Sequence, residues 1–137
     1  MSDPLAETPP PLRLDWLPGH YAVARLAPEA RVPEWCDAAS PAFLSVTRTR
    51  DELSIVAEAS AVPPEVRAER NWCLMRVDGT LDFALIGILS RLTGALASAE
   101  VSVFAISTFD TDYLMVREPD RARAEEALRE VATFVGD

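Results

Sequence analysis

The hexapeptide STFDTD (107–112) concentrates hydrogen-bonding groups between two apolar segments, SVFAI and YLMV. Its carboxylates could bind the ammonium group of a small ligand, its hydroxyls and backbone carbonyls could add acceptors, and its phenyl ring could cover an aliphatic side chain. The alternative is a plain turn, because Asp and Thr are common turn residues that bond to their own backbone. The candidate ligand-binding residues of this segment are Ser107, Thr108, Phe109, Asp110 and Asp112.

A second candidate region precedes this segment. Residues 82–99 (DFALIGILSRLTGALASA) place apolar residues at helical spacing, and Thr80 or Asp82 would cap the helix. Backbone N–H groups at a helix start suit a ligand carboxylate. Gly87 indicates either close approach by a ligand or backbone, or tight packing of the helix on the sheet. The two regions together would make a coherent α-amino-acid site, and a basic side chain would suit the acidic turn best.

The second half of the chain has a regular pattern of elements. A strand is predicted at 72–77, followed by the helix, and two further strands flank the hexapeptide at 102–107 and 111–116. Residues 120–135 carry an apolar stripe with Arg and Glu opposite it, which predicts an amphipathic helix. The predicted order is therefore strand, helix, strand, strand, helix.

The first half repeats part of this order. YAVARL (21–26) aligns with WCLMRV (72–77) at a shift of 51, and residues 45–58 align with 105–118 at a shift of 60. A shortened helix around VPEWCDAAS and an abbreviated one at VPPEVRAER would complete the repeat. We expect an α+β fold with an antiparallel sheet and helices on one face. The expected divisions are a flexible tail (1–12), a first unit (13–68) and a second unit (69–137).

Composition narrows the function. The net charge is −9 and no basic patch is present, which argues against nucleic acid and against anionic membranes as partners. No apolar run reaches the length of a membrane span and no signal peptide is evident, so a cytoplasmic protein is expected. All 13 basic residues are Arg, and His20 is the single histidine. Cys36 and Cys73 are expected to be reduced, buried small residues, and we expect no metal, no cofactor and no catalysis.

The segment from Val77 to Val116 resembles an ACT-type domain, a small ligand-binding module of amino-acid metabolism. The resemblance rests on VSVFAISTFDTDYLMV and on the preceding GTLDFALIGILSRLTGALASAEV. It is strong over residues 72–118 and weaker over 20–60, and the branch that the sequence resembles contains small bacterial tandem ACT proteins and the eukaryotic cytosolic arginine sensors. It implies two tandem ACT-like, ferredoxin-like βαββα units.

The resemblance also implies a function and a site. It implies a non-catalytic regulator, a homodimer, that binds an amino acid at an interface between modules or subunits. The implied site residues are Ser107, Thr108, Phe109, Asp110, Asp112, Gly87 and Ile88, with Asp82 from the preceding loop. In the first repeat the hexapeptide is TRTRDE (47–52), so that unit should not bind the same ligand in the same way. The alternative function is a purely structural dimerisation or interaction module.

Overall fold

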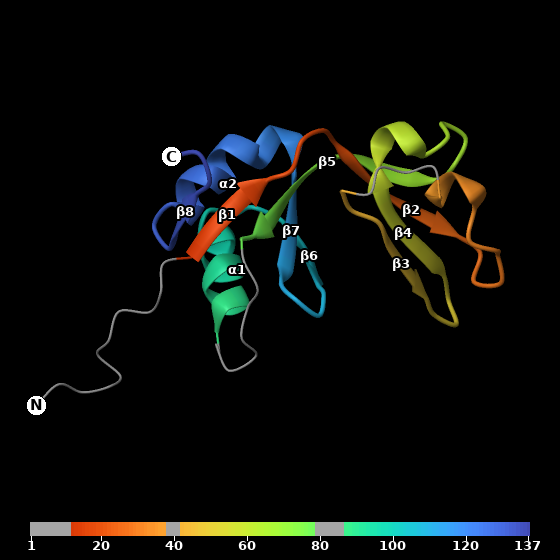
Figure 1. The fold of residues 1–137 in the computed structure, drawn as a ribbon, viewed down its shortest axis with the longest axis horizontal. Coiled ribbons are helices and arrows are strands. Elements are labelled where there is room, and N and C mark those ends of the chain that lie inside the picture. Colours follow the sequence, from red (N-terminus) through yellow and green to blue (C-terminus); the bar gives the residue numbers. More distant parts are fainter. Residues whose placement is uncertain (1–11, 38–41, 79–86) are drawn as a thin grey trace, which may run out of the picture.

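The computed structural model describes residues 12–37, 42–78 and 87–137, and its fold is mixed α+β (Figure 1). The strands are β1 (Leu12–Trp16), β2 (Tyr21–Leu26), β3 (Ser45–Arg48), β4 (Leu53–Glu58), β5 (Ala68–Val77), β6 (Phe104–Ser107), β7 (Asp112–Arg117) and β8 (Ala132–Phe134). The helices are α1 (Ile88–Ser98) and α2 (Arg121–Leu128), with 3-10 turns η2 (Glu34–Cys36), η3 (Ala59–Ala61) and η4 (Glu118–Asp120). No helix of the described ranges is long and apolar enough to cross a membrane.

Strand β5 connects the two halves of the sheet. One edge of β5 pairs with β2 at its beginning and with β1 at its end, and the opposite edge pairs with β7. Strands β4 and β3 extend the sheet beyond β2, while β6 extends it beyond β7 and β8 extends it beyond β1. All of these pairs are antiparallel except β1 with β8. A predominantly antiparallel sheet is therefore confirmed.

Both helices of the second half pack on one face of the sheet. Leu92 and Leu96 of α1 and Leu128 of α2 share one core cluster with Cys73 and Met75 of β5. The side chains of Trp72 and Leu74 belong to a different cluster on the opposite face, as strand alternation requires. Helices on one face are thus observed for this half.

The described part of the first half contains no α-helix, although the sequence predicted two short ones. Its face of the sheet is covered by loops and by η2, and Cys36 and Val62 pack there against Leu53 and Ile55 of β4. The abbreviated helix predicted at VPPEVRAER is wrong, because its last residues begin β5. Of the helix predicted around VPEWCDAAS only η2 is seen, and residues 38–41 lie outside the described ranges.

The last predicted helix is too long. Helix α2 ends at Leu128, and the chain turns through Val131 into β8, where Ala132 and Phe134 face the core beside β1. The apolar residues at 131, 134 and 135 continue the helical stripe in the sequence. In the structure, residues 132 and 134 are buried and 133 is exposed, which is the alternation of a strand. The parallel pairing with β1 decides between the two.

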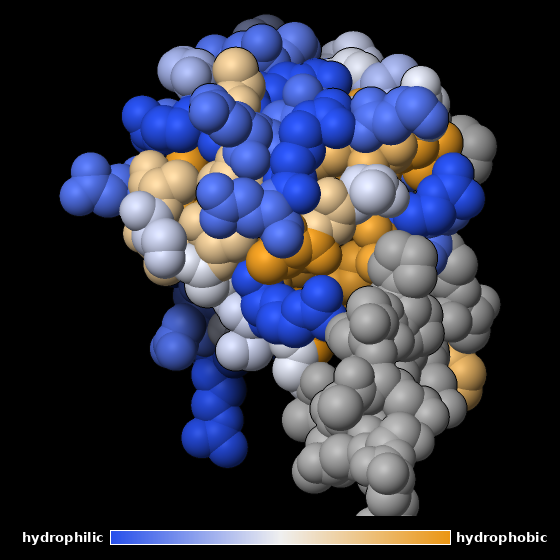
Figure 2. Space-filling view, turned by 90° about the vertical axis from the view of Figure 1, so that its left-hand side faces the viewer, coloured by the Kyte–Doolittle hydropathy of each residue, from blue (hydrophilic) through white to orange (hydrophobic). Residues whose placement is uncertain are grey.

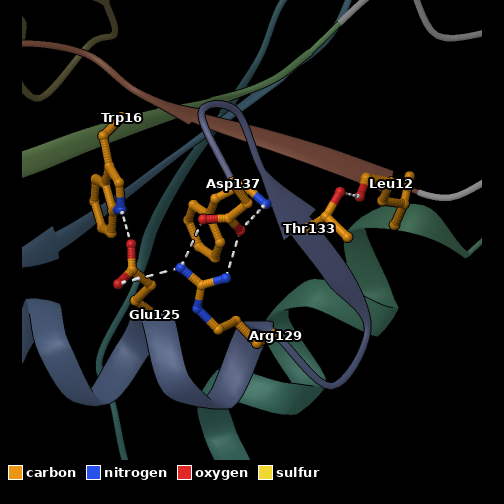
Figure 3. Close-up of polar contacts among 7 residues, drawn as sticks. Leu12, Trp16, Glu125, Arg129, Thr133 and Asp137 are labelled. Atoms are coloured by element: carbon orange, nitrogen blue, oxygen red, sulfur yellow. Dashed lines mark hydrogen bonds and ion pairs between the residues drawn. The ribbon is translucent and has the colours of Figure 1, made fainter.

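Polar contacts fix this chain end (Figure 3). The Arg129 guanidinium contacts the carboxylates of Asp137 and Glu125, and it stacks over the Phe134 ring at 5.0 Å. Glu125 also accepts a hydrogen bond of 2.9 Å from the indole N–H of Trp16 on β1. The end of α2, β1 and the segment after β8 are therefore tied together.

Strand pairing places β1 with the second half, although the sequence groups residues 13–16 with the first unit. Leu14 pairs with Val77 of β5 and with Phe134 of β8, and its side chain is fully buried. Leu12, predicted to end the tail, belongs to β1, and the tail stays a prediction because residues 1–11 lie outside the described ranges. The division near residue 68 remains a prediction, since β5 runs across it.

Strand pairing relates the two halves by a register that differs from the predicted repeat alignment by one residue, and the tandem repeat itself stays a prediction. Tyr21 pairs with Glu58 and Trp72 with Arg117, so corresponding positions lie 51 apart in β2 and β5 and 59 apart in β4 and β7. The bounds of β3 and β6 correspond at the same shift of 59. A shift of 60 would place residues of opposite sheet faces in correspondence.

Candidate functional site

The hexapeptide forms the turn between β6 and β7, and several of its polar groups bond to each other. The Ser107 hydroxyl donates to the Asp112 carboxylate at 2.6 Å. The Thr108 backbone N–H donates to the Thr111 carbonyl at 2.8 Å, and the Thr108 hydroxyl lies 3.1 Å from the same oxygen. Phe109 is 84% exposed at the tip, and Asp110 is also exposed. The turn is therefore stabilised by its own side chains, as the structural alternative expected.

The turn is anchored to the end of β5. The buried Thr111 hydroxyl donates to the Val77 carbonyl at 2.8 Å. In Figure 1 the end of β5, the beginning of α1 and this turn lie toward the same side of the molecule. This arrangement gathers the two regions that the sequence singled out at one side.

The residues predicted around the start of α1 are only partly described. Asp82 lies outside the described ranges. Gly87 precedes α1 with a φ of +85°, a left-handed conformation that favours glycine. A Cβ atom at Gly87 would meet nothing within 4 Å, so no tight packing on described residues explains this glycine. Ile88 is buried in the core and offers little surface to a ligand.

A groove of about 480 Å³ lies between the first hairpin, β3–β4, and strand β6 of the second. β3 and β6 are the two ends of the strand series β3-β4-β2-β5-β7-β6, so the sheet curls until these edges face each other. Within the described ranges each of them pairs on one side only. Both therefore offer unpaired backbone N–H and C=O groups toward a ligand.

The two walls of the groove differ in chemistry. The wall from β3 and β4 is lined by hydroxyls and a carboxylate, from Ser45, Thr47, Thr49, Ser54 and Glu52, together with Val56. The wall from β6 presents Phe104, Ala105 and Ile106, and it ends at Ser107, which bonds to Asp112. Sequence reasoning found only Ser107 of these. The alternation of hydroxyls at positions 45, 47 and 49 was the available signal, because alternate residues of a strand share a face.

Aromatic residues from both halves pack in the cluster that contains the groove residues Val56, Phe104 and Ile106. The Phe43 ring lies 4.6 Å from the Tyr113 ring, and the Trp72 ring lies 6.1 Å from that of Phe104. The Tyr21 hydroxyl and the Trp72 indole N–H are buried without a hydrogen-bond partner among the described residues. Burial, with Glu58 and Tyr113 nearby, raises the pKa of Tyr21 above its usual value. The neutral hydroxyl of Tyr21 and the indole N–H of Trp72 thus belong to the same packed cluster as apolar residues that line the groove.

A second groove, of about 390 Å³, lies between α1 and α2. Its floor contains small residues such as Gly94 and Ala95, and its rim carries Arg91, Arg123 and Glu126 with Glu130. The end of the molecule that includes these helices is largely hydrophilic, with apolar residues showing between charged ones (Figure 2). The mixed charges of this rim favour no particular ligand, so the groove between the hairpins is the better candidate site.

Comparison with known proteins places the chain in a family. The crystal structure of protein Atu0741 from Agobacterium tumefaciens shares 33% identity with it, over 93% of this chain and 94% of that one, with a TM-score of 0.85. The chain belongs to the Atu0741 family. A family model of the ACT domain matches residues 67–130 of this Atu0741-family protein, and a second model, described as an N-terminal domain, matches residues 19–65. No curated protein matches the chain significantly.

More distant solved structures share the fold. Protein VC0802 from Vibrio cholerae is 18% identical over 89% of this chain and 91% of its own, with a TM-score of 0.71. The ligand-free regulatory subunit of aspartate kinase from Thermus thermophilus is 10% identical over 82% of this chain and 93% of its own, with a TM-score of 0.54. The ACT resemblance is thus confirmed over residues 67–130, whereas tandem ACT-like units and the relation to arginine sensors stay predictions.

Proposed function

We propose that this Atu0741-family protein is a non-catalytic regulator that binds an amino acid between its two halves. The observation that carries the proposal is the groove between β3–β4 and β6, because residues of both halves line it. The ACT match and the likeness to a regulatory subunit of aspartate kinase support a regulatory role. A ligand held by both walls would favour one packing of the halves over another, which is how binding acts as a switch.

The groove has the groups that an α-amino acid requires. Glu52 lines the groove. Asp112 accepts a hydrogen bond from Ser107, which lines the end of the groove. Either carboxylate could therefore pair with the ligand ammonium. The unpaired backbone N–H groups of an edge strand suit the ligand carboxylate. Phe104 and Ile106 would cover the aliphatic part of a side chain. Of the residues predicted from the sequence, Ser107 and Asp112 fit this groove best, and Thr108, Phe109, Asp110, Asp82, Gly87 and Ile88 stay predictions.

Calorimetry or thermal shift with each of the twenty amino acids tests the proposal. A ligand at about 100 times its Kd should stabilise the protein by roughly 2.7 kcal/mol. If no amino acid shifts unfolding at millimolar concentration, the amino-acid proposal fails.

Substitution then locates the ligand. Asp112→Asn should weaken binding about tenfold or more, because a charged hydrogen bond contributes roughly 1.5 to 3 kcal/mol. Asp51→Asn is the control, because Asp51 is an aspartate in the turn of the first hairpin that does not line the groove. Equal affinities for Asp112→Asn and the unsubstituted protein would refute the role of Asp112.

A second candidate function is a structural interaction module, and the edge strands favour it. Val46 of β3 is 40% exposed on a strand that pairs only with β4 among the described strands. Pairing of two copies along β3 would form a homodimer. Analytical ultracentrifugation should then show a dimer that Val46→Lys dissociates, because charges on an edge strand disfavour pairing. Val32→Lys, at a loop position 48% exposed, is the control, and an unchanged dimer in Val46→Lys would exclude this edge.

A further inference from the structure

Three side chains with different donor atoms converge away from the groove. The His20 Nε2 atom lies 2.9 Å from a carboxylate oxygen of Glu118, and the Cys73 thiol donates to the same oxygen at 2.7 Å. All three donor atoms lie within 4.8 Å of one another. These residues are far apart in the sequence, which is why sequence patterns did not bring them together.

The strands hold each donor in place. Cys73 pairs with Val116 within the central sheet, which brings Glu118, just after β7, beside its thiol. His20 precedes β2, and its carbonyl accepts a hydrogen bond of 2.9 Å from the Ala59 backbone N–H. The three side chains therefore come from the start of β2, the middle of β5 and the end of β7. A ligand bound to all three would connect β2 to the second half.

The chemistry of this set fits a borderline divalent metal. We propose that His20, Cys73 and Glu118 bind one Zn²⁺ ion. Imidazole, thiolate and carboxylate are all zinc ligands, whereas Mg²⁺ and Ca²⁺ prefer oxygen alone. With Zn–S near 2.3 Å and Zn–N and Zn–O near 2.0 to 2.2 Å, tetrahedral geometry separates ligand atoms by roughly 3.3 to 3.5 Å. The two pairs that involve Glu118, now at 2.7 and 2.9 Å, therefore need to move apart by less than about 1 Å, and the imidazole and thiol already lie within 4.8 Å of each other.

The exposure of the three donors defines the side from which an ion would reach them. Cys73 is fully buried, while the side chains of His20 and Glu118 are each 49% exposed, so an ion would enter from solvent and meet the sulfur beneath. The thiol proton must leave on binding, and thiolate and carboxylate together would balance the charge of the ion. Arg121 is the nearby cation, 3.9 Å from the sulfur, and its guanidinium also stacks over Trp16 at 4.3 Å.

The fold itself does not require these donors. By the register of the repeat, the counterparts of Cys73 and Glu118 in the first half are Ala22 and Ala59, and the counterpart of His20 is Asn71. The corresponding positions therefore carry no thiol, carboxylate or imidazole. The three donors therefore occur together at one of the two corresponding places and not at the other.

Titration calorimetry with Zn²⁺ alone, on tag-free reduced protein, tests the proposal. We expect one ion per chain and an increase in Tm when zinc is added. Co²⁺ in place of zinc should give a thiolate-to-cobalt charge-transfer band. Cys73→Ser should abolish that band, and His20→Asn and Glu118→Gln should each weaken binding at least tenfold. The latter two sites are half exposed, so those variants are expected to fold even if Cys73→Ser does not.

Matched controls use the other residues of the same types. Cys36→Ser removes the second buried free cysteine, and Glu58→Gln removes a carboxylate next to Ala59 in the first half. Both should bind zinc as tightly as the unsubstituted protein. Absence of stoichiometric zinc binding, or unchanged affinity in His20→Asn and Glu118→Gln, would overturn the proposal. No amino acid is present in this experiment, so its outcome is independent of the proposed regulatory function.

Discussion

The hydroxyl of Thr111 ties the second hairpin to the end of β5, because it donates to the Val77 carbonyl from a buried position. Thr111→Val keeps the shape and removes the donor, so we expect a loss of about 1 to 3 kcal/mol in the free energy of unfolding. Denaturant titration measures the change. Thr47→Val is the control, since Thr47 is exposed on β3 and should change stability by less than about 0.5 kcal/mol. Equal effects of the two would show that the Thr111 bond is not stabilising.

Substitution of two apolar residues of the same hairpin by alanine should change the free energy of unfolding by very different amounts. Leu114 is fully buried between the sheet and the helices, so Leu114→Ala should destabilise the protein by about 2 to 5 kcal/mol. Phe109 is 84% exposed, so Phe109→Ala should leave the free energy of unfolding within about 0.5 kcal/mol of the original. The same titration compares them, and a large loss in Phe109→Ala would mean that its ring contributes to the fold.

The single residues of the site were only partly predictable. The polar turn was visible in the sequence, because hydroxyls and carboxylates interrupt two apolar strands. The facing wall from Ser45 to Ser54 was missed. Its alternating hydroxyls are visible in the sequence, but their position opposite β6 depends on how far the sheet curls. The cluster of His20, Cys73 and Glu118 depends on the pairing of three strands, which no local pattern contains.

At the scale of elements, the end of α2 depends on the contact between Arg129 and Asp137. The hydrogen bond from Arg129, and then the one from the Phe134 backbone N–H, lower the pKa of Asp137 below 3.8. A lowered folded-state pKa stabilises the protein above 3.8, and this stabilisation disappears as the pH falls through the lowered pKa. Asp137→Asn should therefore reduce Tm at neutral pH, and its difference from the unsubstituted protein should shrink below pH 3.8.

Thermal melts across this pH range, at low salt, test the prediction. Asp110→Asn is the control, because Asp110 is exposed and its carboxylate has no ion pair or hydrogen bond within the described ranges. It should change Tm little at any pH. A pH-independent difference for Asp137→Asn would show that the charge of this carboxylate is not what stabilises the end of α2.

Elements were more predictable than their ends. Strands β5, β6 and β7 and helix α1 follow from apolar patterns and turn residues, although the first residues of β5 were missed. The C-terminal helix was overextended because 131, 134 and 135 continue its apolar stripe while β8 also buries 132 and 134. Local periodicity could not reveal that β1 lies alongside as a pairing partner.

At the scale of the whole molecule, β1 stabilises the second half of the sheet, because it pairs with β5 and β8, which follow it much later in the sequence. Leu14→Ala should remove about 2 to 5 kcal/mol, and native-state hydrogen exchange should then accelerate mainly in β8 and α1, which share a cluster with Leu14. Leu53→Ala, which is equally buried but belongs to the first-half cluster, should accelerate exchange mainly in β2 to β4. Identical patterns in the two variants would show that the halves open as one unit.

The predicted repeat shows both what comparison of the two halves of the sequence achieves and where it fails. The order of three strands in each half follows from matching YAVARL with WCLMRV and one hairpin with the other. The sequence alignment of the two hairpins was displaced by one residue. It matched Val56 with Val116, whereas the strand pairing of the structure makes Val56 correspond to Met115. Val56 and Met115 share the cluster on the groove side, which only the packed sheet shows.

The pairing of β1 with β8 has a consequence for biosynthesis. β1 leaves the ribosome before every other described strand, yet Leu14 must wait for Phe134, about 120 residues later. At roughly 5 to 20 residues per second, this delay is about 6 to 24 s. Strands β2 to β4 can pair with each other during that time. Translation speed after residue 60 should therefore influence how long Leu12 and Leu14 stay exposed to chaperones.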